Sequence, residues 1–311
     1  MATRKSSPSS PQTIEMRAQL AARIAAHMKN EGVEGTSIPG LALYRRSAPT
    51  PCGSATYEPR LIVFAQGKKR IQLGRSTLLC DNSTFLLTSV DLPVMSQVIE
   101  ATPQKPNLGL LLEFDLPEVR RILSEGEFAH SPASPRGMAV GTTTPELLNP
   151  ILRLLNLLDT PQDIPFLSKL IQQEIVYRLL RTPQGSHLRA IATQGDQGHR
   201  TARAVSWLRA NYAKPLRLEE LASIAQMGVS TLHHHFRSLT AMSPLQYQKQ
   251  LRLHVAREKM LLDGLDAASA AFEVGYESPS QFSREYSRFF GQPPMRHIKS
   301  QGLAASVLSA D

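Results

Sequence analysis

Apolar residues near the end of the chain recur at the spacing of short amphipathic helices, and the same arrangement occurs twice, fifty residues apart. The matching anchors are Leu232 with Phe282, Phe236 with Tyr286, Leu239 with Phe289, and Pro244 with Pro294. Each copy starts with an alanine-rich helix, continues through a glycine-containing turn and ends in a second helix. The pattern predicts two helix-turn-helix units, at 218–239 and 267–290, of the kind that places one helix in a DNA major groove.

The face opposite these anchors is polar in both copies. Arginine, serine and histidine can hydrogen-bond to base edges or to phosphates, so this face is the one expected to contact DNA. His235 falls on the packing face, and consecutive histidines on a helix point about 100° apart, which argues against a shared metal ion. The predicted DNA-binding residues are Ser230, His233, His234 and Arg237 in the first unit, and Ser280, Ser283, Arg284 and Arg288 in the second.

The segment that joins the two units predicts how far apart they lie. Residues 245–263 contain no proline or glycine and precede Gly264, which indicates one continuous helix. At about 1.5 Å per residue this helix is about 28 Å long. Neighbouring major-groove faces lie about 34 Å apart, so one chain is expected to read two adjacent grooves. Three cations along this helix are expected to contact a DNA phosphate or to make no contact with DNA, rather than to contact a base. They are Lys249, Arg252 and Arg257.

The rest of the chain predicts an α+β fold with a β-rich amino-terminal part. Residues 1–38 combine a Ser/Pro-rich, disordered start with an amphipathic helix at 14–30. Short strand-like runs fill 39–116 and predict a small barrel or sandwich, and helices return at 117–182. The predicted organisation is thus an effector-sensing and dimerisation domain at 39–182, a polar linker at 183–199, and a DNA-binding domain at 200–300.

The repeated unit resembles the DNA-binding domain of the AraC/XylS family of bacterial transcription regulators. The matching residues are Leu221-Ala222, Leu232, Phe236, Ser243-Pro244, Arg252-Leu253, Ala256, Gly275-Tyr276, Phe282, Arg284, Phe290-Gly291 and Pro294. The chain departs from the family pattern at Gly228, where a capping serine is usual, and at Lys259, where an apolar residue is usual. Residues 57–74 resemble the amino-terminal domain of one AraC-type subfamily. That resemblance implies a cupin-like sensor barrel, a small-molecule effector and, through helices at 147–180, a homodimer.

Candidate effector contacts within 39–116 are Tyr44, Tyr57, Phe64, Lys68 and Arg70, because aromatic and cationic side chains cluster along these strands. Many cupins bind a metal through histidines, but no histidine occurs between His27 and His130. The sequence therefore predicts no catalytic residue, no metal site and no cofactor. Cys80, in an apolar run, is expected to be a core residue rather than a redox switch, and Cys52 lies in a turn.

Composition agrees with this interpretation. The formal net charge of +9 suits a DNA-binding protein. Two cysteines form no disulfide framework, and the chain shows neither a signal peptide nor a run long enough to span a membrane. We therefore expect a cytoplasmic, effector-responsive regulator whose partners are double-stranded DNA and, if it activates transcription, RNA polymerase. The alternatives are a regulator controlled by a protein partner, and a cupin-like enzyme fused to a DNA-targeting module.

Overall fold

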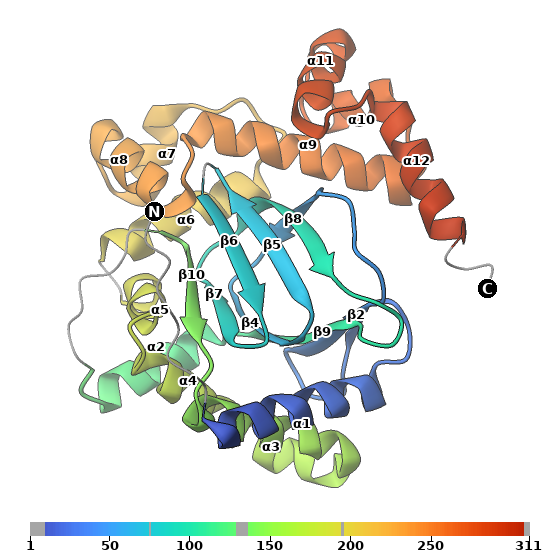
Figure 1. The fold of residues 1–311 in the computed structure, drawn as a ribbon. Coiled ribbons are helices and arrows are strands. Elements are labelled where there is room, and N and C mark those ends of the chain that lie inside the picture. Colours follow the sequence, from blue (N-terminus) through green and yellow to red (C-terminus); the bar gives the residue numbers. More distant parts are fainter. Residues whose placement is uncertain (1–9, 75, 129–135, 194–195, 308–311) are drawn as a thin grey trace.

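The computed structural model describes residues 10–74, 76–128, 136–193 and 196–307, with side chains described as far as residue 300. A β-rich half precedes an all-helical half (Figure 1), which confirms the predicted α+β class. Two antiparallel sheets form the β-rich half, one with the strand order β1-β2-β9-β4-β7-β10 and one with the order β3-β8-β5-β6.

The strands at 68–73 and 76–81 tend to alternate exposed residues with less exposed ones, as half-buried strands should. The strands at 60–66, 84–88 and 107–113 are instead buried along almost their whole length, because both of their faces are covered. Three strands, all at sheet edges, were not among the predicted runs: β1, which falls in the expected helical start, β3 in the smaller sheet, and β10, which pairs with β7. The strands are β1 (Gly32–Gly35), β2 (Leu41–Arg46), β3 (Gly53–Tyr57), β4 (Arg60–Gln66), β5 (Lys68–Leu73), β6 (Ser76–Asp81), β7 (Thr84–Thr88), β8 (Leu92–Glu100), β9 (Asn107–Glu113) and β10 (Met138–Thr142).

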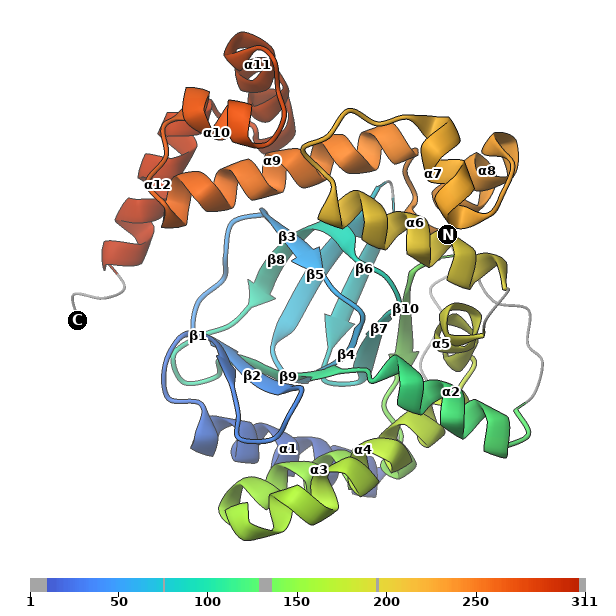
Figure 2. The same ribbon diagram turned by 180° about the vertical axis from the view of Figure 1, so that it is seen from behind.

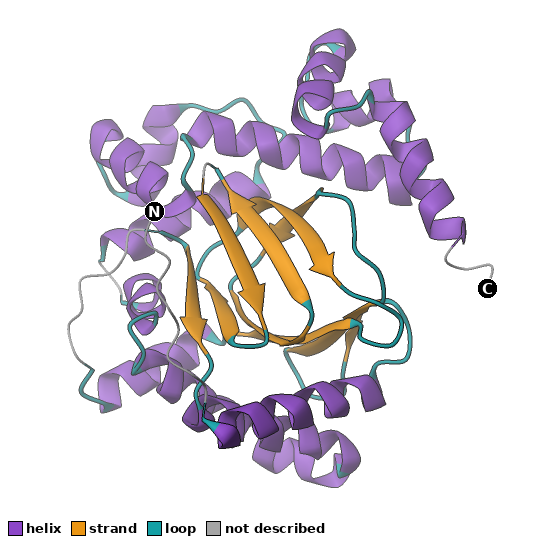
Figure 3. Ribbon diagram, in the orientation of Figure 1, coloured by secondary structure: helices purple, strands orange, loops and turns teal. Residues whose placement is uncertain are grey.

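Helices surround the two sheets on several sides (Figure 3). One group, α1 (Pro11–His27), α3 (Pro145–Asn156) and α4 (Ile164–Leu180), lies together, with α1 packed on β4 and β9. Two 3-10 turns, Leu157–Asp159 and Pro161–Asp163, join α3 to α4. In Figure 2, α2 (Leu116–Glu125) and α5 (Gly185–Ala192) flank the barrel between this group and the DNA-binding domain.

The segment at 183–199 differs from the polar linker that the sequence predicts. Residues 185–192 form the helix α5, and α6 (Gln197–Ala210) begins earlier than expected. Leu188 and Ile191 of α5 are buried in the main core, which explains why this short, glycine-flanked stretch folds. The two halves of the chain are therefore joined by a packed helix.

The helical half contains two helix-turn-helix units joined by one long helix. The first unit comprises α6, α7 (Leu218–Ala225) and α8 (Val229–Thr240); the second comprises α10 (Ala267–Glu273), α11 (Pro279–Phe290) and α12 (Pro294–Val307). The connecting helix α9 (Pro244–Leu262) crosses one end of the barrel (Figures 1 and 2). The first unit shares one continuous hydrophobic core with the barrel, whereas the second has a core of its own.

Candidate DNA-reading face and effector cavity

The predicted anchors hold the helix after the turn in each unit, α8 in the first and α11 in the second. Leu232 and Phe236 of α8 are fully buried, as are Phe282 and Tyr286 of α11. Of the eight predicted DNA-binding residues, those exposed are Ser230, His234, Arg237, Ser280, Arg284 and Arg288, and those partly buried are His233 and Ser283. The polar faces of both helices are thus accessible, as a DNA-reading surface requires.

Both reading helices begin in extended backbone, but they are capped differently. The side chain of Ser278 accepts a hydrogen bond from the backbone N–H of Gln281, and Pro279 is the first residue of α11. Gly228 occupies the same position in α8 and supplies no side-chain cap. The connecting helix α9 has a complete capping box between Ser243 and Gln246. All three helices therefore begin where the sequence predicts.

Cationic residues of α9 that could have contacted phosphate are engaged within the protein instead. The Arg252 guanidinium donates to the backbone carbonyls of Tyr212, Ala213, Lys214 and Gly275, at 2.7–3.1 Å. Arg252 therefore ties the loop after α6 to the turn before α11.

Lys249, on the same helix, forms an ion pair of 2.8 Å with Glu285 of α11. Glu285 also accepts a hydrogen bond from the hydroxyl of Tyr276 at 2.9 Å. These contacts fix α11 relative to α9. Lys249, Tyr276 and Glu285 therefore help to determine the distance between the two reading helices.

A cavity of about 470 Å³ lies between the barrel and α9. Tyr44, Tyr57 and Lys69 form one wall, and the Lys69 ammonium lies 5.7 Å from the ring centre of Tyr44 and 5.4 Å from that of Tyr57. Arg257 reaches the cavity from α9 and donates to the backbone carbonyl and the hydroxyl of Ser54 in β3, at 3.4 and 3.3 Å. The cavity is therefore closed partly by the sensor and partly by the DNA-binding domain.

The charged side chains that line this barrel cavity are all positive, and several polar atoms of the lining are unpaired. Its described lining includes four cationic side chains, Arg46, Arg60, Lys69 and Arg257, and no aspartate or glutamate. Three buried polar atoms of the lining have no hydrogen-bond partner: the Tyr44 hydroxyl, the Arg60 Nε and the Asn107 Oδ1. Buried polar groups are normally satisfied, so these atoms indicate a site built for a bound molecule.

The five predicted effector residues are only partly brought together. Tyr44 and Tyr57 line the barrel cavity, whereas Phe64 is fully buried in the core. Lys68 pairs with Glu100 at 2.6 Å and Arg70 contacts Gln97 at 3.4 Å, both away from the cavity lining. Lys69 was not predicted to line the cavity. It lies on the same face of β5 as the buried Ile71 and Leu73, and this alternation in the sequence could have identified it.

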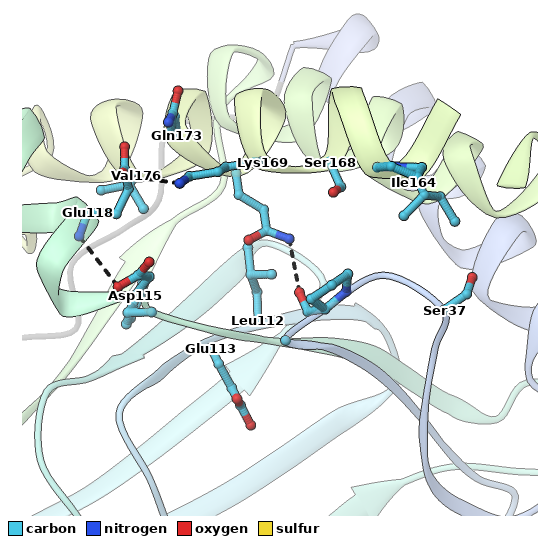
Figure 4. Close-up of a pocket in the computed structure, with 15 residues that line it drawn as sticks. Ser37, Leu112, Glu113, Asp115, Glu118, Ile164, Ser168, Lys169, Gln173 and Val176 are labelled. Carbon is cyan, nitrogen blue, oxygen red and sulfur yellow. Dashed lines mark hydrogen bonds and ion pairs between the residues drawn. The ribbon is translucent and has the colours of Figure 1, made fainter. Parts of the chain in front are cut away.

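A second cavity, of about 680 Å³, lies between α4 and the end of β9 (Figure 4). Ser168 points into it from α4, above Leu112. Several of its polar groups are already paired. Gln172 donates to the backbone carbonyl of Pro39 at 3.0 Å, and Glu118 accepts from Arg121 at 2.9 Å. Mixed charges and internal pairing make this cavity the weaker candidate for a ligand site.

The cysteines and potential metal ligands give no sign of other chemistry. Cys80 is fully buried, and burial raises the pKa of its thiol to about 12, while Cys52 is exposed. In the part of the chain that the structure describes, no group of three or more His, Cys, Asp or Glu side chains could hold a metal ion. Within the same residues, no helix has the length and apolar character needed to cross a membrane.

Comparisons with known proteins address both halves of the chain. Residues 37–187 match the model of the AraC-type transcriptional regulator N-terminus, and residues 221–300 match a helix-turn-helix domain model. The HTH-type transcriptional activator RhaS of Yersinia pestis (strain Pestoides F) is 31% identical over 106 residues, which is 34% of this chain and 38% of that protein. The match thus spans less than half the length of this curated relative.

Solved structures of ToxT from Vibrio cholerae have a similar fold. One crystal form aligns with 83% of this chain and 97% of its own, with a TM-score of 0.53 and 10% identity. The structure of unsaturated fatty acid-bound ToxT from strain SCE256 covers 87% and 97%, with a TM-score of 0.53 and 9% identity. At such low identity this likeness concerns the fold alone. The match of residues 37–187 to an AraC-type regulator model, the match of residues 221–300 to a helix-turn-helix domain model and the similarity to RhaS together show that the chain belongs to the AraC/XylS family, as the repeated helix-turn-helix pattern predicts.

Proposed function

We propose that the protein is a sequence-specific DNA-binding transcription regulator whose single chain reads two adjacent major grooves. The observation that carries this proposal is the pair of exposed polar faces on α8 and α11, joined by the unbroken nineteen-residue helix α9. Because the two faces differ in residue type, each protomer's site should be asymmetric. Successive major grooves on one side of DNA are about 10–10.5 bp apart, so a site that spans two of them should cover about 15–20 bp.

The test compares DNA binding by variants of the full chain on a sequence selected from random DNA. Arg284→Ala, and His233→Ala combined with His234→Ala, should each weaken specific binding by about 1–3 kcal/mol per lost base contact. Arg153→Ala, which removes an exposed arginine of α3, serves as the matched control. Footprinting that shows protection of a single groove, or unchanged affinity in both variants, would contradict the proposal.

The effector of this regulator is, we infer, a small molecule with an anionic group and an apolar or aromatic body, bound in the barrel cavity. The lining holds four cations and no carboxylate, which favours an anion, although Arg46 and Arg60 also pair with Glu31 and Glu58 outside the lining. The two tyrosine rings favour an apolar body. Relatives of the same fold give some support, since one ToxT structure contains an unsaturated fatty acid. The cavity is bounded by Arg257 of α9, so a ligand there would contact both halves of the chain.

Phenylacetate is a suitable probe, with 2-phenylethanol as its uncharged counterpart. Calorimetric titration should show that phenylacetate binds and that Lys69→Met weakens binding about tenfold or more, because a charged hydrogen bond or ion pair is lost. Lys68→Met is the matched control, since Lys68 pairs with Glu100 outside the cavity. Equal binding of the alcohol and the acid would show that the site does not select an anion.

A homodimer is proposed through the outer face of α4. Phe166, Leu170 and Tyr177 are exposed there and fall on one face of the helix, at i, i+4 and i+11, and Leu167 lies beside them. Exposed apolar patches of this kind are typical of interaction sites. Phe166→Asp should shift the full chain toward the monomer in sedimentation, whereas Leu262→Asp, an exposed leucine elsewhere, should not. A wild-type chain that is monomeric at all concentrations would contradict this part.

A further inference from the structure

One carboxylate lies between the effector cavity and the DNA-binding domain. Glu58, in the turn between β3 and β4, accepts from Arg60 through Oε2 and from Arg209 of α6 through Oε1. Arg60 lines the barrel cavity, and its Nε is one of the buried atoms there without a partner. Arg209 belongs to the first helix-turn-helix unit, so Glu58 connects the cavity wall to that unit directly.

The turn that carries Glu58 is held rigidly. The Thr88 hydroxyl donates to the backbone carbonyl of Glu58 and, at 3.1 Å, to that of Arg60, and it accepts from the Arg60 backbone N–H at 3.0 Å. These bonds hold the backbone of the turn in place, so the Glu58 carboxylate stays between the two arginines and can shift from one to the other without moving the turn. A change at one partner must therefore be felt at the other.

The far end of the chain of ion pairs is also anchored. The other Nη of Arg209 donates to Asp91, whose side chain is 9% exposed. The hydroxyl of Tyr247, a fully buried residue of α9, donates to the backbone carbonyl of Asp91 at 2.9 Å. The hydrogen bond from Arg209 lowers the pKa of Glu58, while burial raises the pKa of Asp91. Thus Arg209 bridges two barrel carboxylates beside the start of α9.

We propose that Arg60, Glu58 and Arg209 form a relay in which an anionic effector strengthens the joint between the sensor and the first helix-turn-helix unit. An anion bound by Arg60 competes with Glu58 for that guanidinium. Glu58 is then released to Arg209, and the Glu58–Arg209 pair becomes stronger. This inference rests on the proposed effector site, and it adds the route by which occupancy reaches α6.

The first test needs no ligand. Hydrogen exchange of the α6 amides in the full chain reports how firmly α6 is held. Arg209→Gln should speed this exchange, and the increase should be about two- to fivefold larger when Arg60→Gln is also present, because Glu58 is then committed to Arg209. Repeating the cycle with Glu58→Gln should abolish the difference. If Arg209→Gln speeds α6 exchange equally in the wild type and in the Arg60→Gln background, the relay is overturned.

The second test adds phenylacetate. Phenylacetate should slow α6 exchange in the wild type but not in Glu58→Gln. Because coupling between two sites is reciprocal, Arg209→Gln should weaken phenylacetate binding by the same factor by which phenylacetate slows α6 exchange in the wild type. Arg153→Gln, at a remote ion pair on α3, is the control. Phenylacetate that binds without changing α6 exchange would overturn the relay. If the acid does not bind at all, the proposed effector class is wrong, and the ligand-free cycle still decides whether the relay exists.

Discussion

The first helix-turn-helix unit packs against the barrel, whereas the second is held by α9 and by its own core. Leu208, Phe236 and Tyr247 belong to the cluster that continues into the sheets. In the second unit, Ala270, Phe282 and Tyr286 form a separate cluster with the end of α9. The amino-terminal half therefore packs directly on the first unit, whereas its link to the second unit runs through α9 and Arg257.

The contacts at the joint reinforce this contrast. The backbone N–H of Gly137, which precedes β10, donates to the carbonyl of Leu239 near the end of α8 at 2.6 Å. A Cβ added at Gly137 would lie 2.7 Å from Val90 and 3.1 Å from that carbonyl, so the approach depends on glycine. Toward the second unit, the tie to the barrel is made from the connecting helix α9, where Arg257 hydrogen-bonds to Ser54.

Removing one core ring from each unit should give the largest effects. Phe236→Ala and Phe282→Ala each empty a fully buried site and should cost about 3–5 kcal/mol. Hydrogen exchange should show that Phe236→Ala loosens barrel strands together with α8, while Phe282→Ala loosens only α10 to α12. If Phe282→Ala raised barrel exchange as strongly, the two cores would unfold as one and the comparison would fail.

Arg252 should matter to both units at once, because it binds the carbonyls of the loop after α6 and of Gly275 before α11. Arg252→Ala leaves those carbonyls without their charged donor and should destabilise the chain by about 2–3 kcal/mol. Denaturant unfolding measures this, with Arg288→Ala on the exposed face of α11 as the control. A loss no larger than that of the control would show that water replaces the guanidinium.

The sequence predicts the helices of both units because anchor spacing and turn residues agree locally. The barrel cavity was harder to predict. Lys68 and Arg70 were chosen from a run of three cations, but the strand pairing turns Lys69 inward, with a bulge between Lys68 and Lys69. Arg257 enters the cavity only because α9 docks on the barrel, and no local pattern encodes that docking. The same holds for the bridge from Arg209 to Glu58 and Asp91.

Acid should loosen the second unit first. His254 of α9 is fully buried against Phe289 and Phe290, and burial lowers its pKa from 6.5 to about 3. Between these two values the unfolded chain binds a proton that the folded chain does not, so stability falls as pH falls below about 6.5. From pH 7 to 5.5 the second unit should lose about 1 kcal/mol.

Denaturant unfolding followed by a probe on α11 measures this loss. Burial also lowers the pKa of His297 on α12, so His254→Leu should reduce the pH dependence without removing it. An unchanged pH dependence in His254→Leu would assign the effect to other groups.

The smallest expected effect lies in the caps of the two reading helices, where a matched exchange is available. Gly228 has extended backbone (φ −69°, ψ 153°), and a Cβ added there meets nothing within 4 Å. A serine at that position can accept from the backbone of α8 as Ser278 does in α11, so Gly228→Ser should stabilise the first unit by a few tenths of a kcal/mol. Ser278→Gly should destabilise the second by about the same amount. Denaturation midpoints of the two variants, measured side by side, should therefore move in opposite directions. An unchanged midpoint for Gly228→Ser would mean that α8 is held by its packing on the barrel, and that its cap contributes nothing further.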